Sequence, residues 1–101
     1  MAADKFITIG ELGGHVGSDV SLRGWLQGKR SGGKVAFLQV RDGTGVCQCV
    51  VEAATPDALL AASNLGQESS LAVTGTVRQD ARAPGGYEIA VTSLEVIHSA
   101  E

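Results

Sequence analysis

Basic side chains are concentrated in one stretch of this chain. Five of its eight lysines and arginines fall in a window without aspartate or glutamate, namely Arg23, Lys29, Arg30, Lys34 and Arg41. An aromatic residue, Phe37, lies in the same window. Cations attract phosphates and an aromatic ring stacks on an unpaired base, so this combination suits binding of a single-stranded nucleic acid. The alternative is that these cations form an ordinary solvated face. The cluster indicates binding only if the fold places the Phe37 ring and the cations on one surface.

The chain as a whole is acidic. Its formal net charge is −3, and all 11 carboxylates lie outside the basic window. The net charge alone argues against a nucleic-acid binder, but the distribution of charge decides where an anion can approach.

Two cysteines and two histidines are further candidates for chemistry. Cys47 and Cys49 stand two residues apart in a strand-like run, so both point to one face, while His15 and His98 are distant in sequence. A tetrahedral metal site needs about four ligands. We therefore expect buried, reduced thiols, no metal and no cofactor. The sequence presents no evident nucleophile–base pair or carboxylate dyad, which argues against catalysis.

Alternating hydrophobic residues predict five strands, at residues 20–30, 35–42, 46–52, 71–78 and 87–97. In the first, Arg23, Trp25, Gln27 and Lys29 alternate with core residues such as Leu22 and Leu26. In the second, Phe37, Gln39 and Arg41 face away from Ala36, Leu38 and Val40. Gln48 points away from the two cysteines, so it faces outward if they are buried.

Turn and capping signals separate these strands. Residues 31–33 predict a hairpin loop and residues 42–45 a tight turn. Thr55 and Pro56 predict the start of a helix that continues to Leu65. Thr8 and Glu11 have the spacing of a capping box, which predicts a short helical turn near the N-terminus.

This order of elements defines the predicted fold class. An all-β chain of three strands, a helix and two strands is typical of the OB-fold, a five-stranded Greek-key barrel. We expect a single domain over residues 1–101, with its barrel core at about 18–98. The pattern alone also fits other small barrels or a sandwich.

Four segments narrow the interpretation to a family. They are Val20-Ser-Leu-Arg-Gly-Trp-Leu-Gln-Gly-Lys-Arg30, Lys34-Val-Ala-Phe-Leu-Gln-Val-Arg-Asp-Gly-Thr-Gly45 with Gln48, Val73-Thr-Gly-Thr-Val77, and Arg82-Ala-Pro-Gly-Gly-Tyr-Glu-Ile89 with Leu94-Glu-Val-Ile97. Together they resemble the anticodon-binding domain of the aspartyl-, asparaginyl- and lysyl-tRNA synthetases. The later segments are most similar to asparaginyl members, although archaeal-type aspartyl enzymes share the Ala-Pro-Gly-Gly loop.

The resemblance implies roles for individual residues. In this family a second-strand phenylalanine stacks on an anticodon base, and a third-strand glutamine reads the central uridine. Phe37 and Gln48 occupy those places. Lys29 and Arg30 match basic residues that meet the anticodon backbone or bases, and Glu88 matches a glutamate near the anticodon.

The other site candidates lie near Phe37 in sequence or share its face. They are Arg23, Lys34, Gln39 and Arg41. We expect the five cations of the basic window to form one patch, although ordinary surface charge is the alternative for Arg23 and Arg41. Arg78 and Arg82 are expected outside this patch. Trp25 is expected to pack rather than bind.

The implied function is recognition of a tRNA anticodon stem-loop by the N-terminal module of an asparaginyl- or aspartyl-tRNA synthetase. The family's catalytic motifs do not fit in this chain, so it is expected to be no enzyme alone and to act with a catalytic domain in cis. We expect a monomeric, cytoplasmic domain with no membrane segment. The alternatives are a generic single-stranded nucleic-acid binder, and an OB-fold protein-interaction or engineered scaffold.

Overall fold

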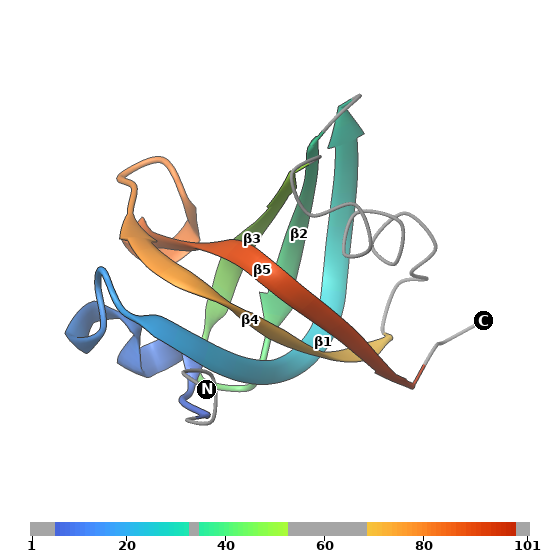
Figure 1. The fold of residues 1–101 in the computed structure, drawn as a ribbon, viewed down its shortest axis with the longest axis horizontal. Coiled ribbons are helices and arrows are strands. Elements are labelled where there is room, and N and C mark those ends of the chain that lie inside the picture. The colour runs from blue at the N-terminus through green and yellow to red at the C-terminus, as the bar shows by residue number, and fades with distance from the viewer. Residues whose placement is uncertain (1–5, 33–34, 53–68, 99–101) are drawn as a thin grey trace.

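The computed structural model describes residues 6–32, 35–52 and 69–98. Its strands are β1 (Asp19–Gly32), β2 (Val35–Arg41), β3 (Val46–Glu52), β4 (Ser70–Gln79) and β5 (Tyr87–His98). They close a barrel in the order β1-β2-β3-β5-β4, with β3 and β5 parallel (Figure 1). The predicted five-stranded OB-fold is therefore confirmed. The predicted helix at 55–65 and Lys34 lie outside the described residues.

The predicted N-terminal turn is a 3-10 helix, η2 (Ile9–Gly14). The backbone N–H of Thr8 donates to the Glu11 carboxylate at 2.8 Å, as the capping box requires. The Ile9 N–H donates to Asp42 in the β2–β3 turn at 2.8 Å, which ties η2 to the barrel. Partial burial acts to raise the pKa of Asp42, but hydrogen bonds from Thr44 and Ile9 outweigh it and hold the pKa below its ordinary 3.8.

The inward residues of the strands fill the barrel. Leu22, Leu38 and Val73 are fully buried, as are both cysteines, whose thiols are free. The predicted face of β2 is confirmed, because its positions alternate between buried and more exposed. In β3, Gln48 is more exposed than Cys47 and Cys49, as expected, but Val50 is buried as well. β4 also alternates buried and partly exposed positions from Ser70 to Val77. Among the described residues, no helix has the length and apolar character needed to cross a membrane.

β1 pairs with two neighbouring strands and contains a bulge between the two pairings. Its first half pairs with β4 and its second half with β2, and the register shifts between Leu26 and Gly28. After this bulge Arg30 lies opposite Phe37, whereas Lys29 lies opposite the buried Leu38. One extra residue thus breaks the predicted strict alternation, yet the Lys29 side chain is exposed, as expected. The predicted loop also starts too early, since β1 continues to Gly32.

Gly75 permits a close approach of β4 to β5. A Cβ atom there would lie 2.2 Å from the Ala90 carbonyl oxygen and 2.7 Å from a methyl group of Ile89. We expect Gly75→Ala to lower the free energy of unfolding by about 1–3 kcal/mol, since backbone must move to admit the methyl group. Urea unfolding measures this, with Gly28→Ala as the matched strand control because nothing lies within 4 Å of its Cβ. Equal stability of the two variants would contradict the close β4–β5 contact.

Candidate nucleic-acid interface

Two rows of cross-strand neighbours run over the outer face of the barrel from β1 to β4. They arise because residues paired across neighbouring strands project to the same side of the sheet. The first row is Arg30, Phe37, Val50, Ala90 and Thr76. The second row is Gly28, Gln39, Gln48, Glu88 and Arg78. An aromatic ring with a cation thus lies beside a band of amides and charges.

The surface is hollowed along these rows. One pocket of about 220 Å³ is lined by Gly28, Lys29, Arg30, Phe37, Gln39 and Gln48. A second, of about 480 Å³, shares Arg30, Phe37 and Gln48 and continues to Arg78, Arg82 and Glu88. We call the two together the groove. It follows the face of β2 and β3 that OB-folds use for oligonucleotides.

Phe37 and Arg30 form the stacking end of the groove. The Arg30 guanidinium carbon lies 5.2 Å from the centroid of the Phe37 ring, within the range of a cation–π interaction. The ring is half-buried, with its strand neighbour Leu38 pointing into the core. Sequence alternation therefore placed Phe37 correctly on the outer face. A π-surface beside a fixed cation can hold a flat, electron-rich group next to a phosphate.

Gln48, Glu88 and Arg78 form a bonded chain in the second row. The Gln48 amide nitrogen donates to one carboxylate oxygen of Glu88 at 3.1 Å. The other oxygen lies 2.6 Å from Nη2 of Arg78. Glu88 is only 8% exposed, so the guanidinium supplies the countercharge that a buried carboxylate requires. A lone glutamate on a strand is usually solvated, but Glu88 is buried and bonded to both neighbours.

Arg78 and Arg82, which were expected outside the basic patch, line the groove together with Arg30. Arg78 pairs across strands with Glu88, and Arg82 lines the same pocket from the β4–β5 loop. They were missed because sequence proximity to Phe37 was the guide, and only the Greek-key order brings β4 and β5 beside β3. The sequence did offer one signal: Arg78 ends the predicted fourth strand and Glu88 begins the fifth, so an antiparallel pair would bring them together.

The β4–β5 loop has a defined shape. Asp80 accepts a hydrogen bond from the Arg82 N–H at 3.0 Å, and its own N–H donates to the Gly86 carbonyl at 2.9 Å. Gly85 and Gly86 have φ values of +73° and +88°, which glycine adopts without strain. Pro84–Gly86 forms the 3-10 turn η3. The Ala-Pro-Gly-Gly segment thus returns the chain to β5 and leaves Arg82 at the rim of the groove.

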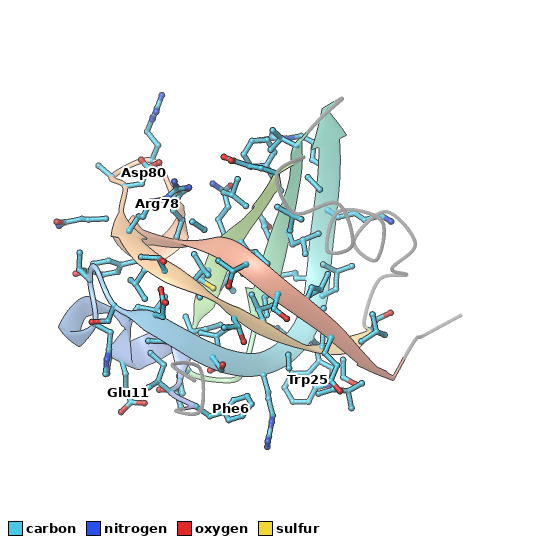
Figure 2. All side chains as sticks on the ribbon, in the orientation of Figure 1. Phe6, Glu11, Trp25, Arg78 and Asp80 are labelled. Atoms are coloured by element: carbon cyan, nitrogen blue, oxygen red, sulfur yellow. The ribbon has the colours of Figure 1, made fainter. Side chains whose placement is uncertain are left out.

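The basic window does not form one patch. Arg23 lies over the ring of Phe6 at 4.1 Å and lines a separate hollow with Thr8 and Glu11. Arg41 lies 5.9 Å from the ring of Trp25, further along the outer face of β2 than Gln39. In Figure 2, Phe6 and Trp25 lie at the lower edge of the barrel, whereas Arg78 and Asp80 lie at the upper left.

Trp25 lies on the outer face of β1, as the alternation predicted, and does not line the groove. The residue is 45% exposed, and its ring lies beside the Arg41 guanidinium. Of the nine predicted site residues, the groove contains Lys29, Arg30, Phe37, Gln39, Gln48 and Glu88. Arg23 and Arg41 do not line it.

Cys47 and Cys49 lie beneath the groove as buried, unreactive thiols. The two sulfur atoms are 3.8 Å apart in the core. The hydrogen bond with Cys47 and burial together raise the pKa of the Cys49 thiol, so it stays protonated at neutral pH. Metal binding requires thiolates. Within the described part of the chain, no three His, Cys, Asp or Glu side chains are grouped to hold a metal ion.

Comparison with known proteins supports a nucleic-acid interface. The chain is 55% identical over 97 residues to the asparagine–tRNA ligase of Pelotomaculum thermopropionicum, covering 94% of this chain and 23% of that protein. It is 50% identical over 93 residues to that of Thermus thermophilus, with 90% and 21% covered. The chain therefore spans about a quarter of the length of these relatives.

Solved structures agree on the fold. An asparaginyl-tRNA synthetase from Pyrococcus horikoshii superimposes with a TM-score of 0.86 at 39% identity, covering 94% of this chain and 23% of that one. An OBody bound to hen egg-white lysozyme has a TM-score of 0.74 at 26% identity, covering 86% and 88%. A family model of the OB-fold nucleic acid binding domain matches residues 20–97. The chain belongs to this tRNA anticodon family of OB-fold domains, which confirms the resemblance seen in the sequence.

Proposed function

We propose that the groove binds the anticodon loop of a tRNA, and that the domain serves asparaginyl-tRNA synthetase in this role. The observation that carries the proposal is the stacking ring of Phe37 beside the polar row that contains Gln48 and Glu88. Identity of 55% to an asparagine–tRNA ligase supports the choice of parent. Aspartyl-tRNA synthetases share the fold at lower identity, as the Entamoeba histolytica enzyme does at 28%.

Each part of the groove has a distinct task in this proposal. Phe37 stacks on one anticodon base, and Gln48 reads the edge of the central uridine. Uracil offers both a donor and acceptors on that edge, and an amide side chain can match both. Arg30 and Arg82 flank the groove, and their guanidinium groups attract the loop phosphates, although Glu52 and Asp80 line the same pocket.

The domain contributes affinity and selectivity and makes no covalent bond. The ligation step belongs to the part of the relatives beyond the matched quarter, joined to this domain in cis. We propose a monomeric domain that acts in the cytoplasm. The likeness to an OBody, which binds lysozyme, favours a protein-binding scaffold as the second candidate. RNA titration separates the two, because a protein-binding scaffold has no reason to prefer one anticodon loop.

The first test is base selectivity. We expect this domain to bind an anticodon hairpin with central uridine about tenfold more tightly than the same hairpin with central cytidine, the effect of one mismatched edge. Fluorescence titration at fixed salt measures both affinities. Gln48→Ala should bring them close together. Equal affinities for the unchanged protein would overturn the reading role of Gln48.

The second test separates stacking from folding. Phe37→Ala should weaken hairpin binding by about 1–3 kcal/mol, the range found for base–aromatic stacking. Leu38→Ala should instead lower the free energy of unfolding by about 2–5 kcal/mol, because Leu38 is fully buried. Titration and urea unfolding of both variants check this contrast. If Phe37→Ala lowered the free energy of unfolding but left hairpin affinity unchanged, the ring would have a structural role only.

The third test concerns phosphate contacts. If the groove contacts about two to four phosphates, a plot of the logarithm of hairpin affinity against the logarithm of salt concentration should have a slope of about −1.4 to −2.8. Arg30→Ala should flatten this slope by about 0.7, since one phosphate contact is lost. Arg23→Ala is the matched control on the same strand, because Arg23 lies over Phe6 outside the groove. A slope that responds equally to both variants would indicate diffuse surface charge instead of a phosphate path.

A further inference from the structure

We propose that Glu88 locks the orientation of the Gln48 amide, and that this lock makes Gln48 selective for uridine over cytidine. Arg78 is the positioning residue that holds Glu88 in place. The inference rests on the proposed function, because it requires that Gln48 meets a base. It goes further in assigning specificity to two residues of β4 and β5 that need not touch the base themselves.

A glutamine amide without a fixed partner is an ambiguous reader. Its oxygen accepts and its nitrogen donates, and a half-turn of the terminal torsion exchanges them at almost no change in shape. Such an amide can present either pattern to a ligand. Selectivity therefore depends on what fixes the torsion.

The carboxylate of Glu88 fixes it. An ionised carboxylate only accepts hydrogen bonds, so only the amide nitrogen of Gln48 can face it at the observed 3.1 Å. The reversed amide would bring two oxygens with lone pairs together. Because Glu88 is only 8% exposed, little water can intervene to relieve that repulsion.

Arg78 fixes the carboxylate in turn. Its Nη2 atom lies 2.6 Å from the second oxygen of Glu88. The three residues stand in register on adjacent strands, Gln48 opposite Glu88 in β3–β5 and Glu88 opposite Arg78 in β5–β4. The ladder of backbone hydrogen bonds holds their Cα atoms, so the chain of side-chain bonds starts from rigid positions.

The locked amide matches only one pyrimidine. Uracil presents the N3–H donor between two carbonyl acceptors, whereas cytosine presents an N3 acceptor beside an amino donor. With its nitrogen turned toward Glu88, Gln48 offers its oxygen to N3–H and its second N–H to a carbonyl of uracil. Opposite cytosine the same oxygen meets a lone pair. An unlocked amide would rotate and pair with cytosine as well.

The decisive variant is Glu88→Gln, which keeps the size of the side chain but can donate as well as accept. We expect the uridine-to-cytidine affinity ratio to fall about tenfold, mainly because cytidine hairpins bind more tightly. Arg78→Met should lower the ratio in the same direction. Arg82→Met is the control, a rim cation with no bond to Glu88 among those described. It should weaken both hairpins equally and keep the ratio. Thermal unfolding verifies that each variant is folded.

A second measurement needs no RNA. The side-chain amide protons of Gln48, followed by NMR in the free protein, should show one strongly shifted proton bonded to the carboxylate. Glu88→Gln should remove that shift. Identical amide spectra of the two proteins would overturn the lock whatever the RNA results.

The outcomes separate this inference from the proposed function. If the unchanged domain does not distinguish the hairpins, the reading role of Gln48 fails, and the lock fails with it. If the unchanged domain distinguishes them and Gln48→Ala abolishes the difference, but Glu88→Gln retains it, the reading role stands and the lock is overturned. A Glu88→Gln variant that weakens both hairpins equally also overturns the lock.

Discussion

The parallel pairing of β3 with β5 is the contact on which the candidate site depends. It closes the barrel and places Gln48 opposite Glu88, residues that are 40 positions apart in the chain. The antiparallel β4–β5 ladder then brings Arg78 to the other side of Glu88. Since cross-strand neighbours project to the same side, one closure step aligns a complete polar row. A slip of one residue in that pairing would turn the row into the core.

The groove can attract an anion, although the protein carries a net negative charge, because its charged side chains are paired locally. The chain is acidic, yet three arginines line the groove beside the carboxylates of Glu52, Asp80 and Glu88. Of these carboxylates, Glu88 is bonded to Arg78 and to the Gln48 amide. Glu88 thus presents little free negative charge to a phosphate. Other carboxylates are also engaged, as Asp42 is by the backbone of η2 and Asp80 by its own loop. Local pairing rather than net charge governs what the surface attracts.

Stability and recognition use opposite faces of the same strands. On β2, Leu38 fills the barrel while Phe37 and Gln39 line the groove. On β3, two buried thiols flank the outward Gln48. Backbone positions are set by the dry interior, so the outward side chains start from fixed points. The part of the site carried by β2 and β3 is therefore preorganised by the barrel itself.

The sequence by itself determined the elements and their faces, since alternation and turn residues act over a few positions. It placed Phe37, Gln39 and Gln48 outward and both cysteines inward, and family motifs directed attention to Arg30 and Glu88. Tertiary structure alone decided which distant side chains meet. Strand order brought Arg78 and Arg82 to the groove and left Arg23 beside Phe6. The β1 bulge set the register that places Arg30 opposite Phe37. These outcomes depend on register and closure, which follow from the packing of the whole barrel and have no local signature in the chain.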